Sequence, residues 1–300
     1  MVEVQWPLMT VERWAESERR VNGAALVQVE GTWWRRVRGL FYRPLNLLET
    51  FSEKTRGPSS GLVFGAIQFP VARGEAANSS IRTIQCVNAR TYSADHLASP
   101  IQRNLKKARR TFQIQPIVDR TAFEQGAYSV YCEFQARTQY EHLRERVHRD
   151  SFQQWTGRLF EFPELRFIGA FESGSLCAVA ITFRLQDTLH YASYFGNERA
   201  LANRASDLVL HSVRESAAQD SGIRRVFAAT AGMPRGLDSF YLRRGFQYLD
   251  LPAVLRGNRL SLALLRWIAP RVHSKLVGAG MPSGPGDDEP WRSESANAVE

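Results

Sequence analysis

The chain has 300 residues, of which 44% are hydrophobic and 23% are charged. This is ordinary globular composition, and the length allows one large domain or two. No apolar run approaches the ~20 residues that span a bilayer, and the start lacks a basic segment followed by an apolar one, so we expect neither a membrane-spanning helix nor a secretory signal. The net charge of +9 attracts phosphates of a cofactor, of RNA or of an acidic membrane, without choosing among them.

The first hundred residues read as rich in strands. A short helix is expected at 10–20 with Thr10 as its N-cap. Strands follow at 24–30 and 33–41 around a turn at 30–32, and two more are expected at 62–70 and 81–87.

A basic amphipathic helix is predicted at 100–112. Its apolar residues recur at helical spacing on one face, and another face carries Arg103, Lys106, Lys107 and Arg110. This basic face fits either contact with the phosphates of tRNA or simple solvation. It lacks the interleaved aromatics of a base-stacking platform, so we expect no DNA partner. A strand at 113–118 and helices at 120–135 and 148–159 follow.

The carboxyl-terminal half has a sharper pattern of β-β-β-α-β-α-β. Its elements are expected at 166–172, 175–185 after a turn at 173–174, 189–195, 206–219, 226–230, 236–244 and 246–254. On the third strand, strict alternation would put His190 and Tyr194 on one face and Tyr191 on the other.

A motif near the end of this pattern carries a family resemblance. Phe240-Tyr241-Leu242-Arg243-Arg244-Gly245-Phe246 reads as a helix that ends at a glycine and leads into a strand. It resembles the corresponding segment of the GNAT acyltransferases, and the resemblance covers about residues 165–255. It implies that Tyr241 protonates the departing thiolate of coenzyme A, with a packing tyrosine of the core as the alternative.

A second motif narrows the resemblance. Arg103-Asn104-Leu105-Lys106-Lys107-Ala108 looks like a helix of Fem-type proteins, which join two GNAT-like halves in tandem. The implied fold class is α/β (α+β), a GNAT-like mixed and mainly antiparallel sheet flanked by helices. The implied parts are a degenerate GNAT-like half at 1–112, an acyltransferase domain at 113–256, an amphipathic basic helix at 257–277 and a disordered tail at 278–300.

The resemblance also places a cofactor loop before the helix at 206–219. A helix N-terminus offers free N–H groups to a pyrophosphate. The implied binding residues are Arg199, Asn203, Arg204, Ala205 and Ser206, with Ser206 as a candidate cap and acetyl-CoA or another acyl-CoA as co-substrate. The glycines that GNAT enzymes carry here are missing, which weakens the prediction of coenzyme A.

The residue that deprotonates the acceptor is left open by the sequence. His190 and Asp238 are candidates, Glu198 is equally plausible, and water could serve instead. The cysteines at 86, 132 and 177 are odd in number and far apart, and the histidines do not cluster, so no metal site is expected.

The segment 258–275 is apolar, aromatic and basic. It fits either a helix packed on the fold or one that lies in a membrane interface.

Together these patterns favour an N-acyltransferase that moves an acyl group from an acyl thioester, on coenzyme A or a carrier protein, to a small or lipid-linked amine. A Fem-like transferase that uses aminoacyl-tRNA on a cell-envelope precursor, and a GNAT-derived binding protein without turnover, are the alternatives. We expect a cytoplasmic protein with a peripheral position at the inner membrane face as one option.

Overall fold

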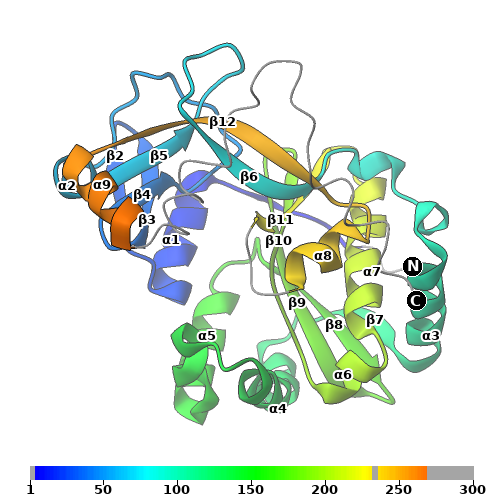
Figure 1. Cartoon of the computed structure of the whole chain (residues 1–300). Coiled ribbons are helices and arrows are strands. Elements are labelled where there is room, and N and C mark those ends of the chain that lie inside the picture. The colour runs from blue at the N-terminus through cyan, green and yellow to red at the C-terminus, as the bar shows by residue number, and fades with distance from the viewer. Residues whose placement is uncertain (1–3, 232–235, 269–300) are drawn as a thin grey trace. The chain divides into compact units, whose positions relative to one another are not determined.

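The computed structural model describes residues 4–231 and 236–268, and Figure 1 shows its elements. The chain packs into two compact units. Unit 1 comprises Met1–Arg36 and Arg82–Asp250, and unit 2 comprises Val37–Ile81 and Leu251–Glu300. The units therefore do not follow the expected division at residue 112, because the chain enters unit 2 early and returns to it at the end.

Unit 1 holds most of the regular structure. Its strands are β1 (Leu8–Met9), β2 (Leu26–Val29), β3 (Thr32–Arg38, ending just inside unit 2), the second part of β6 (Ser79–Cys86), β7 (Gln113–Pro116), β8 (Arg166–Glu172), β9 (Ser175–Leu185), β10 (Thr188–Gly196), β11 (Arg225–Thr230) and the start of β12 (Gln247–Gly257). Its α-helices are α1 (Val11–Asn22), α3 (Ser99–Thr111), α4 (Arg120–Thr138), α5 (Arg149–Phe160), α6 (Glu198–Ala202), α7 (Ala205–Gln219) and α8 (Leu237–Leu242). Short 3-10 helices lie at Ala89–Thr91, Ala94–His96 and Glu141–Val147.

The main sheet of unit 1 has the strand order β7-β8-β9-β10-β11-β6. Neighbouring strands are antiparallel except for β10 and β11, which run parallel. β1 pairs in parallel with the end of β9, and β2 and β3 pair antiparallel as a hairpin. The mixed, mainly antiparallel α/β fold that the sequence predicts is confirmed.

Helices cover both faces of this sheet (Figure 1). On one face, Leu189 and Tyr191 of β10 belong to a core cluster with residues of α3 and α7. On the other face, Phe195 of β10 packs against Tyr131 of α4 and Trp155 of α5. The central strands are therefore apolar on both sides, which explains their nearly continuous hydrophobic sequence.

Unit 2 is smaller and contains the remaining elements. These are β4 (Phe41–Pro44), α2 (Ser59–Phe64), β5 (Ala66–Pro70), the first part of β6, the remainder of β12 and α9 (Arg259–Ile268). β4 pairs in parallel with β5, and β5 pairs antiparallel with β12. None of the helices in the described part of the chain is long and apolar enough to cross a membrane.

Local signals explain where the sequence predicts elements well and where it does not. Thr10 caps α1 as predicted, since its hydroxyl accepts a hydrogen bond from the Arg13 N–H at 3.2 Å. The expected strand at 62–70 is wrong at its start, because residues 59–64 form α2 and the strand begins only at Ala66. The tail at 278–300 lies outside the described residues.

Candidate functional site

The two parallel strands of unit 1 separate after a short contact. β10 and β11 pair only through Thr188↔Arg225, Leu189↔Val226 and His190↔Phe227 in the described chain. From there β10 continues to Gly196 along β9, and β11 continues to Thr230 along β6. Among the described residues, the facing edges of the two strands beyond His190 therefore carry backbone groups without a partner in the sheet, which a ligand could use.

A β-bulge lies at the start of this separation. Tyr191 pairs with Thr182 and Ser193 pairs with Ile181, so Ala192 is an extra residue in β10. Ala192 and Ser193 are exposed although they lie in a central strand. The exposed bulge marks an opening in the sheet, which we call the strand split and define by residues 191–194 of β10 and 228–230 of β11.

The bulge also corrects the predicted alternation along β10. Tyr191 and Tyr194 both pack against the core cluster on the α7 face. His190 faces the other way and stacks on Phe183 at 4.6 Å between ring centroids. The extra residue shifts the alternation by one, so strict counting along the strand fails here.

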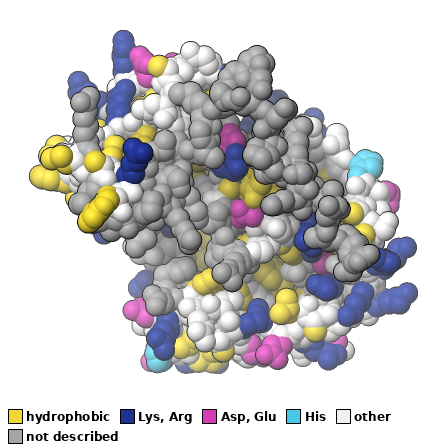
Figure 2. Space-filling model, in the orientation of Figure 1, with side chains coloured by type: hydrophobic (Ala, Val, Ile, Leu, Met, Phe, Trp, Pro, Cys, Tyr) yellow, Lys and Arg dark blue, Asp and Glu magenta, His cyan; other side chains and the backbone are white. Residues whose placement is uncertain are grey.

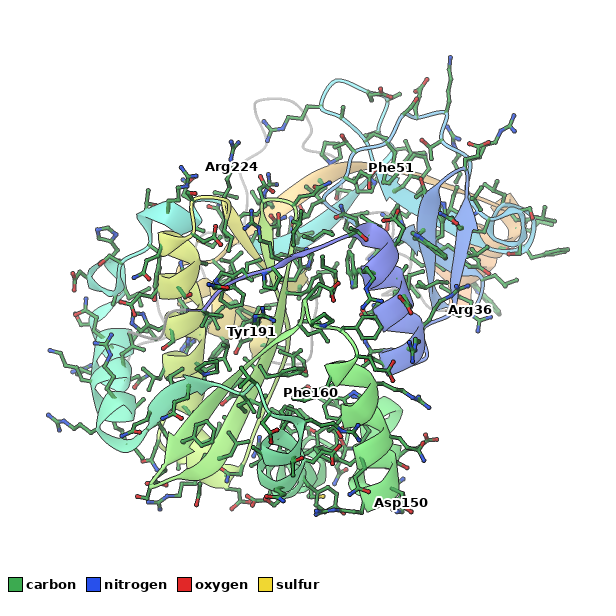
Figure 3. The ribbon with its side chains drawn as sticks, turned by 180° about the vertical axis from the view of Figure 1, so that it is seen from behind. Arg36, Phe51, Asp150, Phe160, Tyr191 and Arg224 are labelled. Atoms are coloured by element: carbon green, nitrogen blue, oxygen red, sulfur yellow. The ribbon has the colours of Figure 1, made fainter. Side chains whose placement is uncertain are left out.

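Tyr241 of α8 lies beside the strand split. Its ring centroid is 6.4 Å from that of Tyr191, the residue before the bulge, and 5.3 Å from that of Phe246. Figure 3 labels Tyr191 within the interior of unit 1. Burial raises the pKa of Tyr241 above its ordinary value, against a smaller opposing effect of the Arg244 guanidinium, so the phenol keeps its proton at neutral pH.

The loop before α7 adopts the backbone shape of a glycine turn without a glycine. Arg204, the N-cap of α7, has φ 65° in the left-handed region, which costs a non-glycine residue about 1–2 kcal/mol. The predicted cap Ser206 is instead the second residue of the helix, after the buried Ala205, which belongs to the core cluster against which Tyr194 packs. The start of α7 is therefore held close to the strand split.

Two other predicted binding residues are engaged within the loop. Arg199 forms an ion pair with Glu172 of β8, with Nη2 at 2.6 Å from a carboxylate oxygen. Asn203 donates a side-chain hydrogen bond to the Arg199 carbonyl at 3.3 Å. A phosphate at this place would have to draw Arg199 away from Glu172.

A buried ion pair near the start of α7 was missed by the sequence reading. Asp207, the third residue of the helix, is paired with Arg244, which also donates to the Phe240 carbonyl at 2.6 Å. The other Asp207 oxygen accepts from Asn104 of α3 at 3.2 Å. A carboxylate in the first helical turn already stabilises the positive end of the helix dipole. Its only sequence signal is the Arg244 of the Tyr241 motif.

His190 has surroundings that disfavour the expected general-base role. It is buried among Trp14, Phe183 and Phe227, and its Nε2 has no hydrogen-bond partner in the described chain. Burial lowers the pKa of His190 to about 3. An imidazole this weakly basic, on the face opposite Tyr191, is poorly placed to remove a proton from an amine.

Asp238 lies on α8, three residues before Tyr241. It is half-buried and accepts a hydrogen bond from the Tyr248 hydroxyl at 3.0 Å. The contact fixes the start of α8 to β12. Asp238 therefore remains a candidate carboxylate, on the same helix as Tyr241.

The basic side chains of α3 fall into two groups, one that contacts the loop before α7 and one that is exposed to solvent. Lys107 donates to the Ala202 carbonyl at 3.0 Å and so helps to hold the loop before α7. Arg103, Lys106 and Arg110 are exposed. These three are the cations that remain available to a polyanion.

A hollow of about 470 Å³ lies between α3, β7 and α7. His211 of α7 borders it and contacts Tyr92 through Nδ1 at 2.8 Å and Arg109 through Nε2 at 2.7 Å, with Glu215 at 3.4 Å. Burial, with Arg109 and Arg214, lowers the pKa of His211. In residues 4–231 and 236–268, no group of three or more metal-ligating side chains is arranged to hold a metal ion.

Comparison with solved structures identifies proteins that have a similar fold. No protein-family model and no curated protein matches the sequence. The carboxyl-terminal DUF2156 domain of a protein assigned as a lysylphosphatidylglycerol synthetase from Agrobacterium fabrum matches with a TM-score of 0.53 and 9% identity, over 83% of this chain and 91% of that one. FemX matches with a TM-score of 0.51 and 8% identity, over 85% and 92%.

A conserved protein of unknown function from Bacteroides thetaiotaomicron matches with a TM-score of 0.50 and 9% identity, over 79% of this chain and 88% of that one. At such low identity these likenesses establish the fold alone. The likeness to FemX confirms the Fem-like fold that the second sequence motif predicts.

Proposed function

We propose that this protein is a GNAT-type transferase that moves an acyl group from an activated donor to an amine at the strand split. The observation that carries the proposal is the separation of β10 from β11 after three paired residues, with Tyr241 beside the bulge. The separated edges offer backbone N–H groups to a carbonyl oxygen, and Tyr241 offers a proton to the leaving group.

The first candidate donor is an acyl thioester such as acetyl-CoA. Ala205, the first residue of α7, belongs to the core cluster against which Tyr194 packs, on the face of the sheet where Tyr191 meets Tyr241. A helix start in this position supports binding of a phosphate, with Arg204 exposed beside it.

The second candidate donor is an aminoacyl ester, as on charged tRNA. Two observations favour it. Asp207 already supplies a negative charge within the first turn of α7, and Glu172 engages Arg199, so the place of a pyrophosphate is less positive than the cation count implies. A lysylphosphatidylglycerol synthetase, by its name, also makes an aminoacylated product, which is the same class of transfer.

The basicity of the leaving group also favours the aminoacyl ester as donor. A free thiol has a pKa of about 8.5, so a thiolate leaves without a strong need for an acid. An alkoxide leaving from an ester is far more basic. A phenol whose pKa burial has raised above its ordinary value is better matched to the alkoxide.

The acceptor is proposed to be a neutral amine, small or lipid-linked, that attacks the carbonyl carbon. Because His190 is buried and weakly basic, Asp238, Glu198 or water is the better candidate to take the amine proton.

Thermal unfolding with ligands tests the proposal and separates the two donors. The arms are acetyl-CoA, a longer acyl-CoA, free CoA and charged tRNA, each at 100 times its Kd where that can be reached. Binding should then add about 2.7 kcal/mol of stability. A rise with an acyl-CoA that the Arg199→Ala/Arg204→Ala variant loses would support the thioester.

The matched control replaces two exposed arginines away from the loop, Arg73 and Arg224, by alanine. It should keep any response to acyl-CoA. A rise with charged tRNA alone would establish the second donor, and no rise with any arm would contradict the transferase proposal.

A further inference from the structure

Helix α9 in unit 2 has an unusual composition for a surface helix. Apart from Arg259, Ser261 and Arg266, all of its residues are apolar. The apolar face of a surface helix ordinarily packs against the core of its own domain. Yet Leu260 is 81% exposed and Trp267 is 82% exposed.

The exposed apolar residues of α9 form one stripe. Leu260, Ala263 and Trp267 are all exposed and are spaced by three and four positions, which places them on one face of a helix. Scattered single apolar residues are normal on a surface, but a stripe that ends in a tryptophan is a candidate contact surface.

A second helix of unit 2 extends the stripe. Val63 and Phe64 end α2 and are 52% and 70% exposed. Their carbonyls are tied to the start of α9, since Asn258 donates to Val63 at 2.9 Å and Ser261 donates to Phe64 at 3.2 Å. Figure 2 shows hydrophobic side chains gathered over the end where Figure 1 places α2 and α9.

We name this surface the α2–α9 surface and define it by Val63, Phe64, Leu260, Ala263 and Trp267. Its charge identifies the occupant. Neither α2 nor α9 contains an aspartate or glutamate, and the exposed Arg266 lies beside Trp267. We propose that the α2–α9 surface binds the interface of an anionic lipid bilayer.

The length of the helix fixes how it would bind. Ten residues make a helix of about 15 Å, which is half the hydrocarbon thickness of a bilayer. α9 therefore lies along the interface, with its apolar stripe among the acyl chains and Arg266 at the headgroups. Tryptophan favours this depth because its ring is apolar and its N–H is polar.

Flotation of the full chain with vesicles tests the proposal. One vesicle set is phosphatidylcholine alone, and the other contains phosphatidylglycerol as well. The chain should bind the anionic vesicles, and Phe64→Ser/Trp267→Ser should weaken the partition coefficient by about ten-fold or more, because two aromatic side chains leave the lipid. Arg266→Glu should weaken binding to the anionic vesicles specifically.

The matched control is Val118→Ser, which removes an apolar side chain that is 84% exposed in unit 1. It should bind like the unchanged chain. Equal binding by Phe64→Ser/Trp267→Ser would overturn the proposal, since the net charge alone would then hold the protein on the vesicles. A concentration-dependent dimer that this double variant abolishes, without vesicle binding, would also overturn it and assign the surface to a second copy.

Discussion

At the scale of single residues, Tyr241 carries the proposed chemistry. It is held by ring contacts with Tyr191, Phe240 and Phe246, so its position does not depend on its hydroxyl. Removing the oxygen should therefore leave the packing intact. This makes phenylalanine a clean probe of proton donation.

Tyr241→Phe should lower kcat by about 10²–10⁴-fold with little change in thermal midpoint, as expected for loss of a general acid. Steady-state rates with the donor found by thermal unfolding provide the measurement. Tyr128→Phe is the control, because it removes a phenol of α4, away from the strand split, that donates to the Val147 carbonyl at 2.8 Å. An unchanged rate in Tyr241→Phe would assign this residue to packing.

His190 gives a prediction about stability. Its pKa is about 3 in the folded chain, against an ordinary value of about 6.5 in the unfolded chain. The unfolded state binds a proton that the folded state refuses, so stability falls as the pH drops from about 6.5 towards 3. His190→Phe removes this titration and keeps a ring against Phe183.

The free energy of unfolding is measured with urea at pH 7.5 and at pH 5, for both proteins. The unchanged chain should lose about 2 kcal/mol more stability between these two pH values than His190→Phe does. The comparison of the two differences removes the contribution of carboxylates that titrate alike in both proteins. Equal falls in both would show that His190 takes a proton in the folded state.

At the scale of elements, α3 and α7 act together. Asn104, Lys107 and Arg109 of α3 all contact α7 or the loop before it. Arg103, Lys106 and Arg110 face solvent. The helix thus combines a structural face with a free basic face, and only the second can bind a polyanion without loss of packing.

If the donor is charged tRNA, the triple variant Arg103→Ala/Lys106→Ala/Arg110→Ala should bind it with a weaker salt dependence. The slope of the logarithm of the association constant against log[salt] should become shallower by about 2–3, because each lost phosphate contact removes about 0.9. Filter binding across a salt series measures this slope. Alanine at the exposed Arg36, Arg73 and Arg224 is the charge-matched control. An unchanged slope in the first variant would make the basic face a solvated surface.

Elements with strong local signals could be predicted from the sequence, and those decided by distant contacts could not. The hairpin of β8 and β9 matches its predicted bounds because Ser173 and Gly174 both take positive φ at the turn. The strand start predicted at residue 62 failed because a short apolar run reads alike as helix or strand.

The same division holds at the site. Tyr241 could be predicted as a candidate because its motif is contiguous, and its catalytic role stays a prediction. The bulge at Ala192 depends on pairing with β9, and the Asp207–Arg244 pair joins residues far apart in the chain. The small residues at Ala192 and Ser193, which interrupt a run of larger ones, are the one signal that could have indicated the opening.

At the scale of the whole molecule, the units are discontinuous in sequence. β11 pairs with residues 83–86 of β6, and α7 packs with α3 in one core cluster. The expected domain at 113–256 lacks both of these partners. The boundary drawn from sequence therefore cuts through the core of unit 1.

A fragment of residues 113–256 should accordingly show no cooperative thermal transition, because β11 would become an open edge and the α7 face would lose Ala108 and Phe112. A fragment of residues 82–256 restores both partners and is the matched comparison. Calorimetry and circular dichroism should show a sharper transition for the longer fragment. A cooperative transition in 113–256 at the midpoint of the full chain would mean that this segment folds as an independent domain and that β6 and α3 add little to its core.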